Sequence, residues 1–294
     1  MNAAGELTGR VFDVSRACVH DGPGLRTVAF LKGCGLHCPW CQNPEGVSPD
    51  PELAIDANLC IQCGHCREAC QVAASGVRAG CRACGRCASA CPPGARRVVG
   101  RDVTVDELVR ELRRDEDFCR ASGGGVTFSG GEPLAQARFV LAAAAELRAA
   151  GVHVAVETAG NWPRRLAGDV AAGFDLVLFD IKHPDAMRFR DATGGDAALV
   201  AANLDGLLAA GVPLEVRVTI VPGFNDGPAD LDAIAAFLRD RPRVPVRFQA
   251  FHRMARAKEA LYGRPYQAAS IVPAGASTLA AAAQRLAAGG VEVA

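Results

Sequence analysis

The sequence predicts an α/β fold, namely an incomplete (β/α)6 TIM-like barrel interrupted by a small inserted domain. From residue 100 onward, short apolar strands alternate with amphipathic helices, the pattern of βα units around a parallel sheet. Polar motifs follow several of these strands, where such a barrel carries its site. Pro51–Val99 is rich in glycine and cysteine and shows few helix or strand signals. We therefore expect a barrel domain of residues 1–50 and 100–294 and an inserted domain of residues 51–99.

Each predicted element follows from its apolar pattern. A first pair of strands, Gly9–Val19 and Leu25–Lys32, precedes the insert. The later strands are Gly125–Phe128, His153–Glu157, Asp175–Asp180, Leu214–Val221 and Val246–Phe251. The helices are Val105–Ala121, Leu134–Ala150, Arg164–Ala172, Ala197–Ala210, Ala229–Arg239 and Ser277–Ala288. This count gives about six parallel strands, fewer than a closed barrel has.

Length and charge narrow the class of protein. The 294 residues correspond to about two domains. Lys plus Arg equals Asp plus Glu at 32 each, so no net charge draws the chain to nucleic acid or to an anionic membrane. No run of about 18 apolar residues predicts a membrane span. The longest alanine-rich run, Val140–Ala150, is interrupted by Glu146 and Arg148.

Cys34, Cys38 and Cys41 form a C-x3-C-x2-C run without a fourth cysteine. Thiolates are the usual ligands of a [4Fe–4S] cluster, and a cluster held entirely by protein takes four of them. Three close cysteines therefore predict a cluster with one iron open to a small molecule. A zinc site is the alternative, but two C-x2-C pairs or a set of cysteine and histidine ligands would be more usual there.

Two further cysteine runs share the spacing C-x2-C-x2-C-x3-C. They are Cys60, Cys63, Cys66 and Cys70, then Cys81, Cys84, Cys87 and Cys91. In bacterial ferredoxins with this spacing, the fourth cysteine of each run binds the cluster of the other run. Two more [4Fe–4S] clusters are therefore predicted. Only 10 residues separate the runs, and Gln71 stands where proline usually follows, so the cross-ligation and the fold of this linker stay open.

The remaining cysteines and the start of the chain indicate the compartment. Eleven of the 13 cysteines lie in the three runs, and we expect Cys18 and Cys119 to be buried as small hydrophobic residues. A disulfide framework is the alternative for the runs, but a chain of this length needs no such staples, and we find no signal peptide. The clusters imply a reducing, anaerobic cytoplasm.

Charged residues mark the ends of the predicted strands. Gly130-Gly131-Glu132 follows Gly125–Phe128, where the glycines allow a close backbone approach and the alternative is a turn with a capping acid. Asp180 and Lys182 point the same way at a strand end, and their alternative role is a surface ion pair. The other candidates on strands at this face are Glu157, Arg217 and His252, and a lone histidine is more often structural.

Together these motifs resemble the glycyl-radical enzyme activating enzymes of the radical S-adenosylmethionine (SAM) superfamily, relatives of pyruvate formate-lyase activase. Asp21-Gly22-Pro23-Gly24-Leu25-Arg26, Gly123–Ser129 and Asp180-Ile181-Lys182 support the likeness, which extends from Gly9 to about Gly263. The insert with two clusters resembles the subgroup that serves glycerol or diol dehydratases, arylacetate decarboxylases and choline lyases. Gly35 stands where proline is common in this subgroup.

The resemblance implies which residues bind SAM. The amino and carboxylate groups of SAM would chelate the open iron. The Gly-Gly-Glu motif and Asp180 would hold the ammonium of SAM, and Lys182 would hold its carboxylate. His252 would lie near the ribose or adenine. The implied cofactor-binding residues are Trp40, Cys41, Gln42, Gly130, Gly131, Glu132, Glu157, Asp180, Lys182, Arg217 and His252.

The resemblance also implies the reaction and the partners. A flavodoxin or ferredoxin would supply an electron, SAM would be cleaved to methionine and a 5′-deoxyadenosyl radical, and this radical would take a hydrogen from a glycine of a partner glycyl-radical enzyme. We expect a monomer that binds neither nucleic acid nor membrane. Two alternatives are a radical SAM enzyme with auxiliary clusters that acts on a small molecule or another peptide, and a non-catalytic electron carrier.

Overall fold

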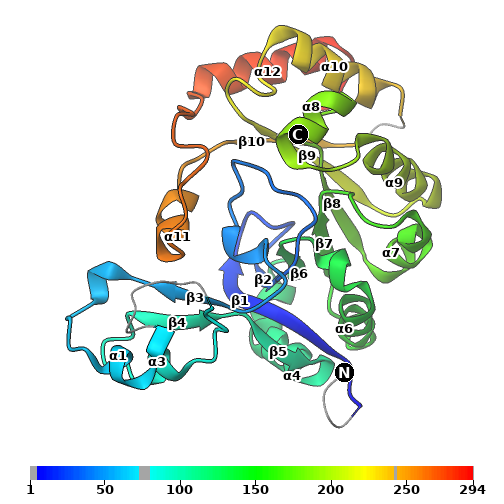
Figure 1. Ribbon diagram of the computed structural model, residues 1–294. Helices are drawn as coiled ribbons and strands as arrows, with labels where there is room; N and C mark the ends of the chain where they lie inside the picture. Colours follow the sequence, from blue (N-terminus) through cyan, green and yellow to red (C-terminus); the bar gives the residue numbers. More distant parts are fainter. Residues whose placement is uncertain (1–4, 73–79, 242–243, 294) are drawn as a thin grey trace.

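The computed structural model describes residues 5–72, 80–241 and 244–293, which form an α/β fold around one mostly parallel sheet (Figure 1). The strand order is β10-β9-β8-β7-β6-β2-β1-β5. The bounds are β1 (Thr8–Cys18), β2 (Arg26–Leu31), β5 (Arg101–Thr104), β6 (Gly125–Gly130), β7 (Val154–Thr158), β8 (Leu176–Asp180), β9 (Leu214–Ile220) and β10 (Val246–Ala250). β2 and β6 to β10 are mutually parallel, and β1 is antiparallel to both neighbours. The predicted first strand pair and the count of parallel strands are confirmed.

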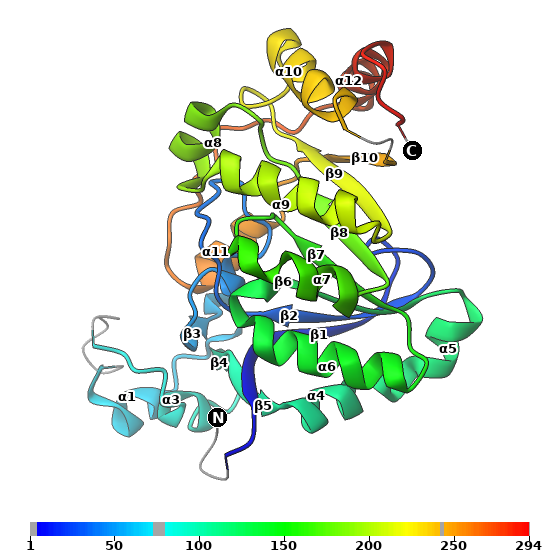
Figure 2. The ribbon, with the colours of Figure 1, turned by 90° about the vertical axis from the view of Figure 1, so that its right-hand side faces the viewer.

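Helices cover one face of this sheet, and α6, α7 and α9 lie side by side in front of the strands in Figure 2. The bounds are α4 (Val105–Leu112), α5 (Glu116–Ala121), α6 (Ala137–Ala149), α7 (Ala167–Gly173), α8 (Ala186–Thr193), α9 (Ala197–Ala210), α10 (Pro228–Arg239), α11 (Ala255–Leu261) and α12 (Ala276–Ala288). Apolar side chains from the strands and helices, such as Phe128, Leu147 and Leu204, are fully buried between the two layers. This burial is the main stabilising term of the fold.

The single helix predicted over Val105–Ala121 is wrong, because a 3-10 turn at Arg113–Asp115 separates α4 from α5. α4 begins with a capping box between Thr104 and Glu107 and buries an apolar face that ends at Leu112. The next five residues are all charged, so no apolar side chain is available to continue that face. The helical periodicity therefore ends earlier than propensity alone predicts.

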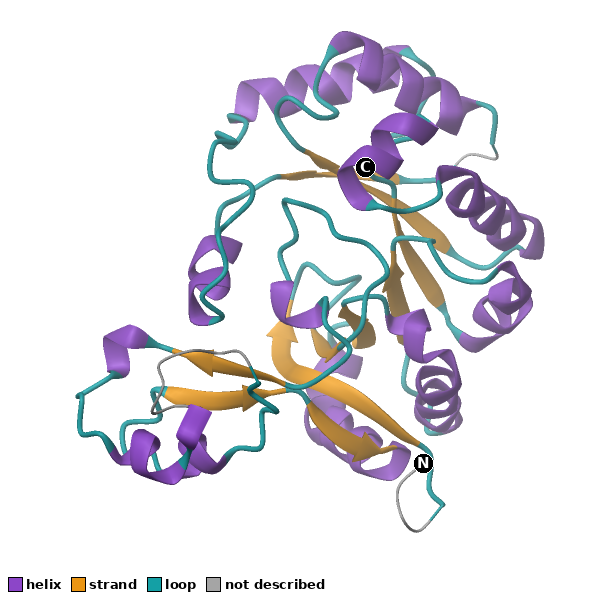
Figure 3. Cartoon of the chain, viewed as in Figure 1, coloured by secondary structure: helices purple, strands orange, loops and turns teal. Residues whose placement is uncertain are grey.

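The cysteine-rich segment, residues 51–99, forms a separate small unit to the lower left in Figure 3. Its two strands, β3 (Glu52–Ile55) and β4 (Arg96–Val99), pair antiparallel and do not join the main sheet. Between them lie a 3-10 turn at Ala57–Leu59 and the helices α1 (His65–Ala69) and α3 (Arg86–Ser89). Residues 73–79 of the linker between the two cysteine runs lie outside the described ranges. The sequence showed few signals here because each helix is only about one turn long.

None of the helices in the described ranges combines the length and the apolar character that crossing a membrane requires.

Candidate active site

The three cysteines of the first run lie in a loop that follows β2, and all three line one cavity. Backbone hydrogen bonds hold this cysteine loop (residues 33–47): Gly33 N donates to Gly46 O at 2.7 Å, and Cys34 N donates to Val47 O at 3.1 Å. Its outer side is fixed by His37 N, which donates to Thr193 O at 2.8 Å. The loop therefore closes on itself, which brings the predicted thiol ligands together.

The opposite wall of the cavity consists of residues at the carboxyl ends of the parallel strands. β6, β7, β8, β9 and β10 all contribute, and the residues are Ser129, Gly130, Gly131, Glu157, Thr158, Ala159, Asp180, Lys182, Thr219 and Gln249. This is the position at which sheets of this type bind their ligands. The structure therefore brings these polar strand ends together around one cavity.

Burial opposes ionisation of the three thiols of the first run. It raises the pKa of Cys34 to about 12 and that of Cys38 to about 11, and it also raises the pKa of Cys41. Metal ligation would displace the thiol protons. Among the described residues, no set of three His, Cys, Asp or Glu side chains converges on a single point as one metal ion requires. A [4Fe–4S] cluster does not require such convergence, because each thiolate binds a different iron.

Asp180 and Lys182 form an ion pair inside the cavity, and both side chains are largely buried. Burial opposes the charge on Lys182, but the Asp180 carboxylate, together with Cys38 and Cys41, more than offsets it and raises the pKa of the lysine. Among the described residues, three buried polar atoms of the lining have no hydrogen-bond partner, namely Asp180 Oδ1, Trp40 Nε1 and Gln42 Oε1. Buried polar atoms in proteins are normally paired, so these atoms fit a polar ligand.

Glu157, in β7, is held at the cavity wall by one group from β6 and one from β9. Ser129 Oγ donates to it at 2.6 Å, and Arg217 donates to it at 3.0 Å. Arg217 is itself buried, binds Glu215 and donates to the carbonyl of His20. It does not line the cavity. The structure therefore places Arg217 behind Glu157, where it holds that carboxylate in position.

Glu132 lies outside the cavity lining, and its carboxylate is occupied by the protein itself. It accepts hydrogen bonds from Thr158 Oγ, at 2.8 and 2.9 Å, and from the backbone N–H groups of Leu134 and Ala159. Burial raises the pKa of Glu132 to about 7. The carboxylate expected to hold the SAM ammonium is therefore paired with groups of the protein. The alternative of a capping acid describes the observed contacts.

The two glycines before Glu132 are required by backbone packing. A Cβ at Gly131 would lie 2.4 Å from Gly46 O and 2.5 Å from Gly33 O, so this position touches both ends of the cysteine loop. Only glycine allows so close an approach. The motif thus joins the end of β6 to the cysteine loop.

His252 lies outside the cavity, and the prediction that Cys18 is buried is wrong. The side chain of His252 is exposed and does not line the cavity, and its carbonyl accepts a hydrogen bond from Gln42 Nε2 at 2.9 Å. Cys18 is only partly buried, because it lies at the end of β1, whereas Cys119 is buried as expected. Sequence analysis also missed Asn43, Thr219 and Gln249 in the lining. Thr219 and Gln249 are paired neighbours near the ends of β9 and β10. A polar residue near the end of a strand is the same signal that identified Asp180.

A second cavity lies in the cysteine-rich segment and is lined by Cys60, Cys63, Cys66 and Cys91. Its lining thus contains the first three cysteines of one run and the last cysteine of the other. The two runs also repeat an unusual backbone: Gln62 and Ala83, and then Gly64 and Gly85, all have positive φ. Each run therefore makes the same turn before its short helix.

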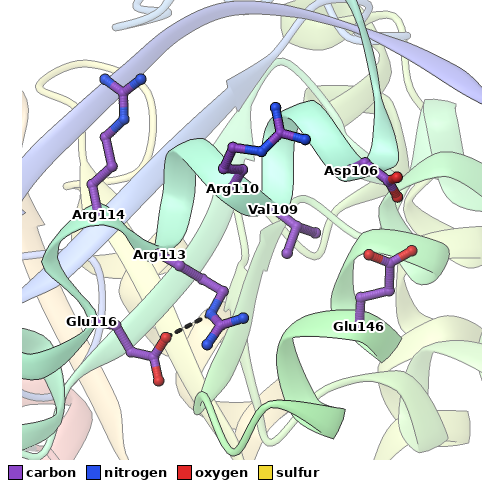
Figure 4. Close-up of a pocket in the computed structure, with 7 residues that line it drawn as sticks. All are labelled: Asp106, Val109, Arg110, Arg113, Arg114, Glu116 and Glu146. Carbon is purple, nitrogen blue, oxygen red and sulfur yellow. Dashed lines mark hydrogen bonds and ion pairs between the residues drawn. The ribbon is translucent and has the colours of Figure 1, made fainter.

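One further depression lies on the outer surface, where α4 and α5 meet α6 (Figure 4). It is lined by Asp106, Val109, Arg110, Arg113, Arg114, Glu116 and Glu146. An ion pair joins Arg113 and Glu116 at 2.6 Å. The depression contains no cysteine and no residue from the strand ends, so it is separate from the candidate active site.

Comparisons with known proteins identify the family of this chain. Residues 28–238 match the model of the radical SAM superfamily. The isethionate sulfite-lyase activating enzyme of Nitratidesulfovibrio vulgaris is 40% identical, over 86% of this chain and 87% of that protein. The benzylsuccinate synthase activating enzyme of Thauera aromatica is 38% identical, over 96% of this chain and 91% of that protein.

A solved structure shares the fold. It is a domain of pyruvate-formate lyase-activating enzyme from Bacteroides vulgatus, with a TM-score of 0.50, 22% identity, and coverage of 58% of this chain and 98% of that chain. The chain belongs to the radical SAM superfamily and, within it, to the activating enzymes of glycyl-radical enzymes. This family uses SAM and a [4Fe–4S] cluster, and its substrate is a protein.

Proposed function

We propose that this chain activates a glycyl-radical enzyme by cleaving SAM at a cluster held by Cys34, Cys38 and Cys41. The observation that supports it most strongly is that these three thiols share one cavity with the Asp180–Lys182 ion pair and with unpartnered polar atoms. When bound, the cluster and SAM supply a radical that takes a hydrogen from a glycine of the partner. The protein itself binds the cofactors, orients them and excludes water from the cavity.

The charges of the cavity fit those of SAM. Lys182 would bind the carboxylate of SAM, and the free oxygen of Asp180 and the carboxylate of Glu157 would bind its ammonium. Trp40 Nε1 and Gln42 Oε1 are a donor and an acceptor left for the polar atoms of the nucleoside. Arg217 and Glu132 act through other groups, since Arg217 holds Glu157 and the Glu132 carboxylate binds Thr158 and Ala159 at the end of β7. His252 acts through its carbonyl, which orients Gln42.

Asp180→Ala and Lys182→Ala should each weaken SAM binding by about 1.5–3 kcal/mol, or about 10- to 150-fold, the range for hydrogen bonds to charged groups. Calorimetric titration of SAM into the reconstituted protein measures this effect. Asp106→Ala, in the outer depression, is the control and should bind SAM like the parent chain. If both cavity variants keep the parent affinity, Asp180 and Lys182 are not SAM ligands.

We also propose that the sheet is an incomplete barrel and that residues 51–99 form a ferredoxin-like domain with two cross-ligated clusters. Cys60, Cys63, Cys66 and Cys91 would hold one cluster, and Cys70, Cys81, Cys84 and Cys87 the other. The shared cavity of the first set and the repeated turns of the two runs support this assignment. A flavodoxin or ferredoxin would donate the electron. The protein would be a monomer and would act in the cytoplasm.

The activity is tested directly with the reconstituted protein, SAM, dithionite and the glycyl-radical enzyme encoded beside it. We expect 5′-deoxyadenosine together with the electron paramagnetic resonance doublet of a glycyl radical on the partner. SAM cleavage without that doublet, for every glycyl-radical enzyme encoded in the same genome, would instead support a small-molecule or peptide substrate. No SAM cleavage at all would refute both assignments.

A further inference from the structure

Lys32 lies where the cysteine-rich segment leaves and rejoins the main fold. It directly follows β2, and its side chain is fully buried. A Cβ at Gly100 would lie 2.5 Å from Lys32 Cδ and 3.2 Å from the Cα of Pro51. The two ends of the segment therefore touch at Pro51 and Gly100, and the lysine side chain lies beside this junction. Gly100 leaves the space that it needs.

The ammonium of Lys32 joins the segment to the cysteine loop. It donates to the carbonyl of Glu45, in the loop, at 2.6 Å and to the carboxylate of Glu52, in β3, at 3.2 Å. Arg264, just after α11, makes the equivalent pair of contacts, because it binds Glu52 and donates to the carbonyl of Pro44. Two cations of the main fold thus hold one carboxylate of the segment against two neighbouring carbonyls of the loop.

The apolar contact at the same junction is small. Ala54 and Val99 pack against Tyr262, with Phe12 and Leu261 at the edge. A two-stranded ribbon such as β3–β4 is marginally stable by itself. A buried ammonium that loses its partner is costly, so a charged cluster of this kind allows few alternative orientations. The charges rather than the apolar surface therefore specify how the segment sits.

We propose that Lys32 is a positioning residue that, with Glu52 and Arg264, fixes the cysteine-rich segment in one orientation against the cysteine loop. Cys81 lines a pocket together with Glu52 and Arg264, so the second cysteine run begins beside this latch of three residues. The inference concerns the geometry of the chain, and it holds or fails independently of the partner that the protein activates.

The test measures the distance between the segment and the sheet in the oxidised, reconstituted protein. Spin labels on non-canonical amino acids at Glu68, in α1, and Ala145, in α6, both exposed, report it by double electron–electron resonance. We expect one narrow distance distribution for the parent chain and a second, longer population for Lys32→Met. Lys258→Met is the matched control. Lys258 binds the same loop, and its hydrogen-bond and ion-pair partners in the described structure all lie there.

Glu52→Gln provides a second test if Lys32→Met does not fold. It keeps both cations and the size of the side chain, and the folded variant should also give the longer population. Its unfolding temperature should fall, because the buried Lys32 ammonium loses its carboxylate partner. If the folded variants all keep the single parent distance, Lys32 only fills space and the latch does not exist. If Lys258→Met gives the same second population, the effect belongs to the loop and the proposal is also refuted.

Discussion

The triple variant Cys34→Ala, Cys38→Ala, Cys41→Ala should release no 5′-deoxyadenosine and should still contain about two clusters' worth of iron. The three thiols lie in the cavity with the Asp180–Lys182 pair, so their loss removes the ligands of the proposed SAM cluster. The eight cysteines of residues 51–99 are unchanged in this variant, and four of them line a different cavity. The variant should therefore lose SAM cleavage and keep the iron of the other two clusters.

Mössbauer spectroscopy with iron counting, on protein reconstituted without oxygen, measures this separation. Cys18→Ala is a control of the same chemistry outside the three runs, and it should keep both the iron and the cleavage activity of the parent. Iron near zero in the triple variant would contradict the assignment of clusters to residues 51–99. Cleavage that survives would instead contradict the role of the first run.

The order of strands and helices could be predicted because the spacing of apolar residues within a short stretch of sequence distinguishes a helix from a strand. Helix Ala197–Ala210 was predicted with its observed bounds, since Asp196 caps its start and Gly211 ends it. The break after Leu112 and the helix α8 were missed. α8 holds its position largely through contacts that sequence does not show, such as Arg188 binding the carbonyl of Phe224.

The cavity could be predicted in part for the same reason. Residues next to each other in a motif, such as Asp180 and Lys182, stay together after folding, and strand ends meet at one edge of a parallel sheet. The sequence does not show which groups a side chain will contact after folding. Glu132 and Arg217 lie one layer behind the lining because Thr158 and Glu157, distant in sequence, bind them there.

The cysteine loop is held by contacts from the far end of the chain, which no local pattern contains. Lys258 Nζ donates to the carbonyl of Gln42 at 2.9 Å, and Arg264 binds the carbonyl of Pro44. Residues around α11 thus contact both the loop and the base of the cysteine-rich segment. A change in the segment can therefore reach the active-site loop through this junction.

Removal of residues 51–99 tests whether the segment takes part in the chemistry or only delivers electrons or docks the partner. The ends of the cut are neighbours in the structure, since Glu52 pairs with Val99, so a short glycine linker can rejoin them. The deletion removes the Glu52 partner of the buried Lys32 ammonium, and it should therefore carry Lys32→Met to avoid an unpaired charge.

We expect the rejoined chain to fold, to bind SAM and to cleave it with dithionite, because every residue of the SAM cavity lies outside the cut. With flavodoxin as the only reductant, or with the partner enzyme as the substrate, its activity should be lost. The full-length chain with Lys32→Met is the control for the added substitution. Release of 5′-deoxyadenosine under both reductants separates these outcomes. A folded deletion that binds SAM and is inactive even with dithionite would show that the segment belongs to the chemistry, because the strong reductant bypasses any delivery of electrons through it.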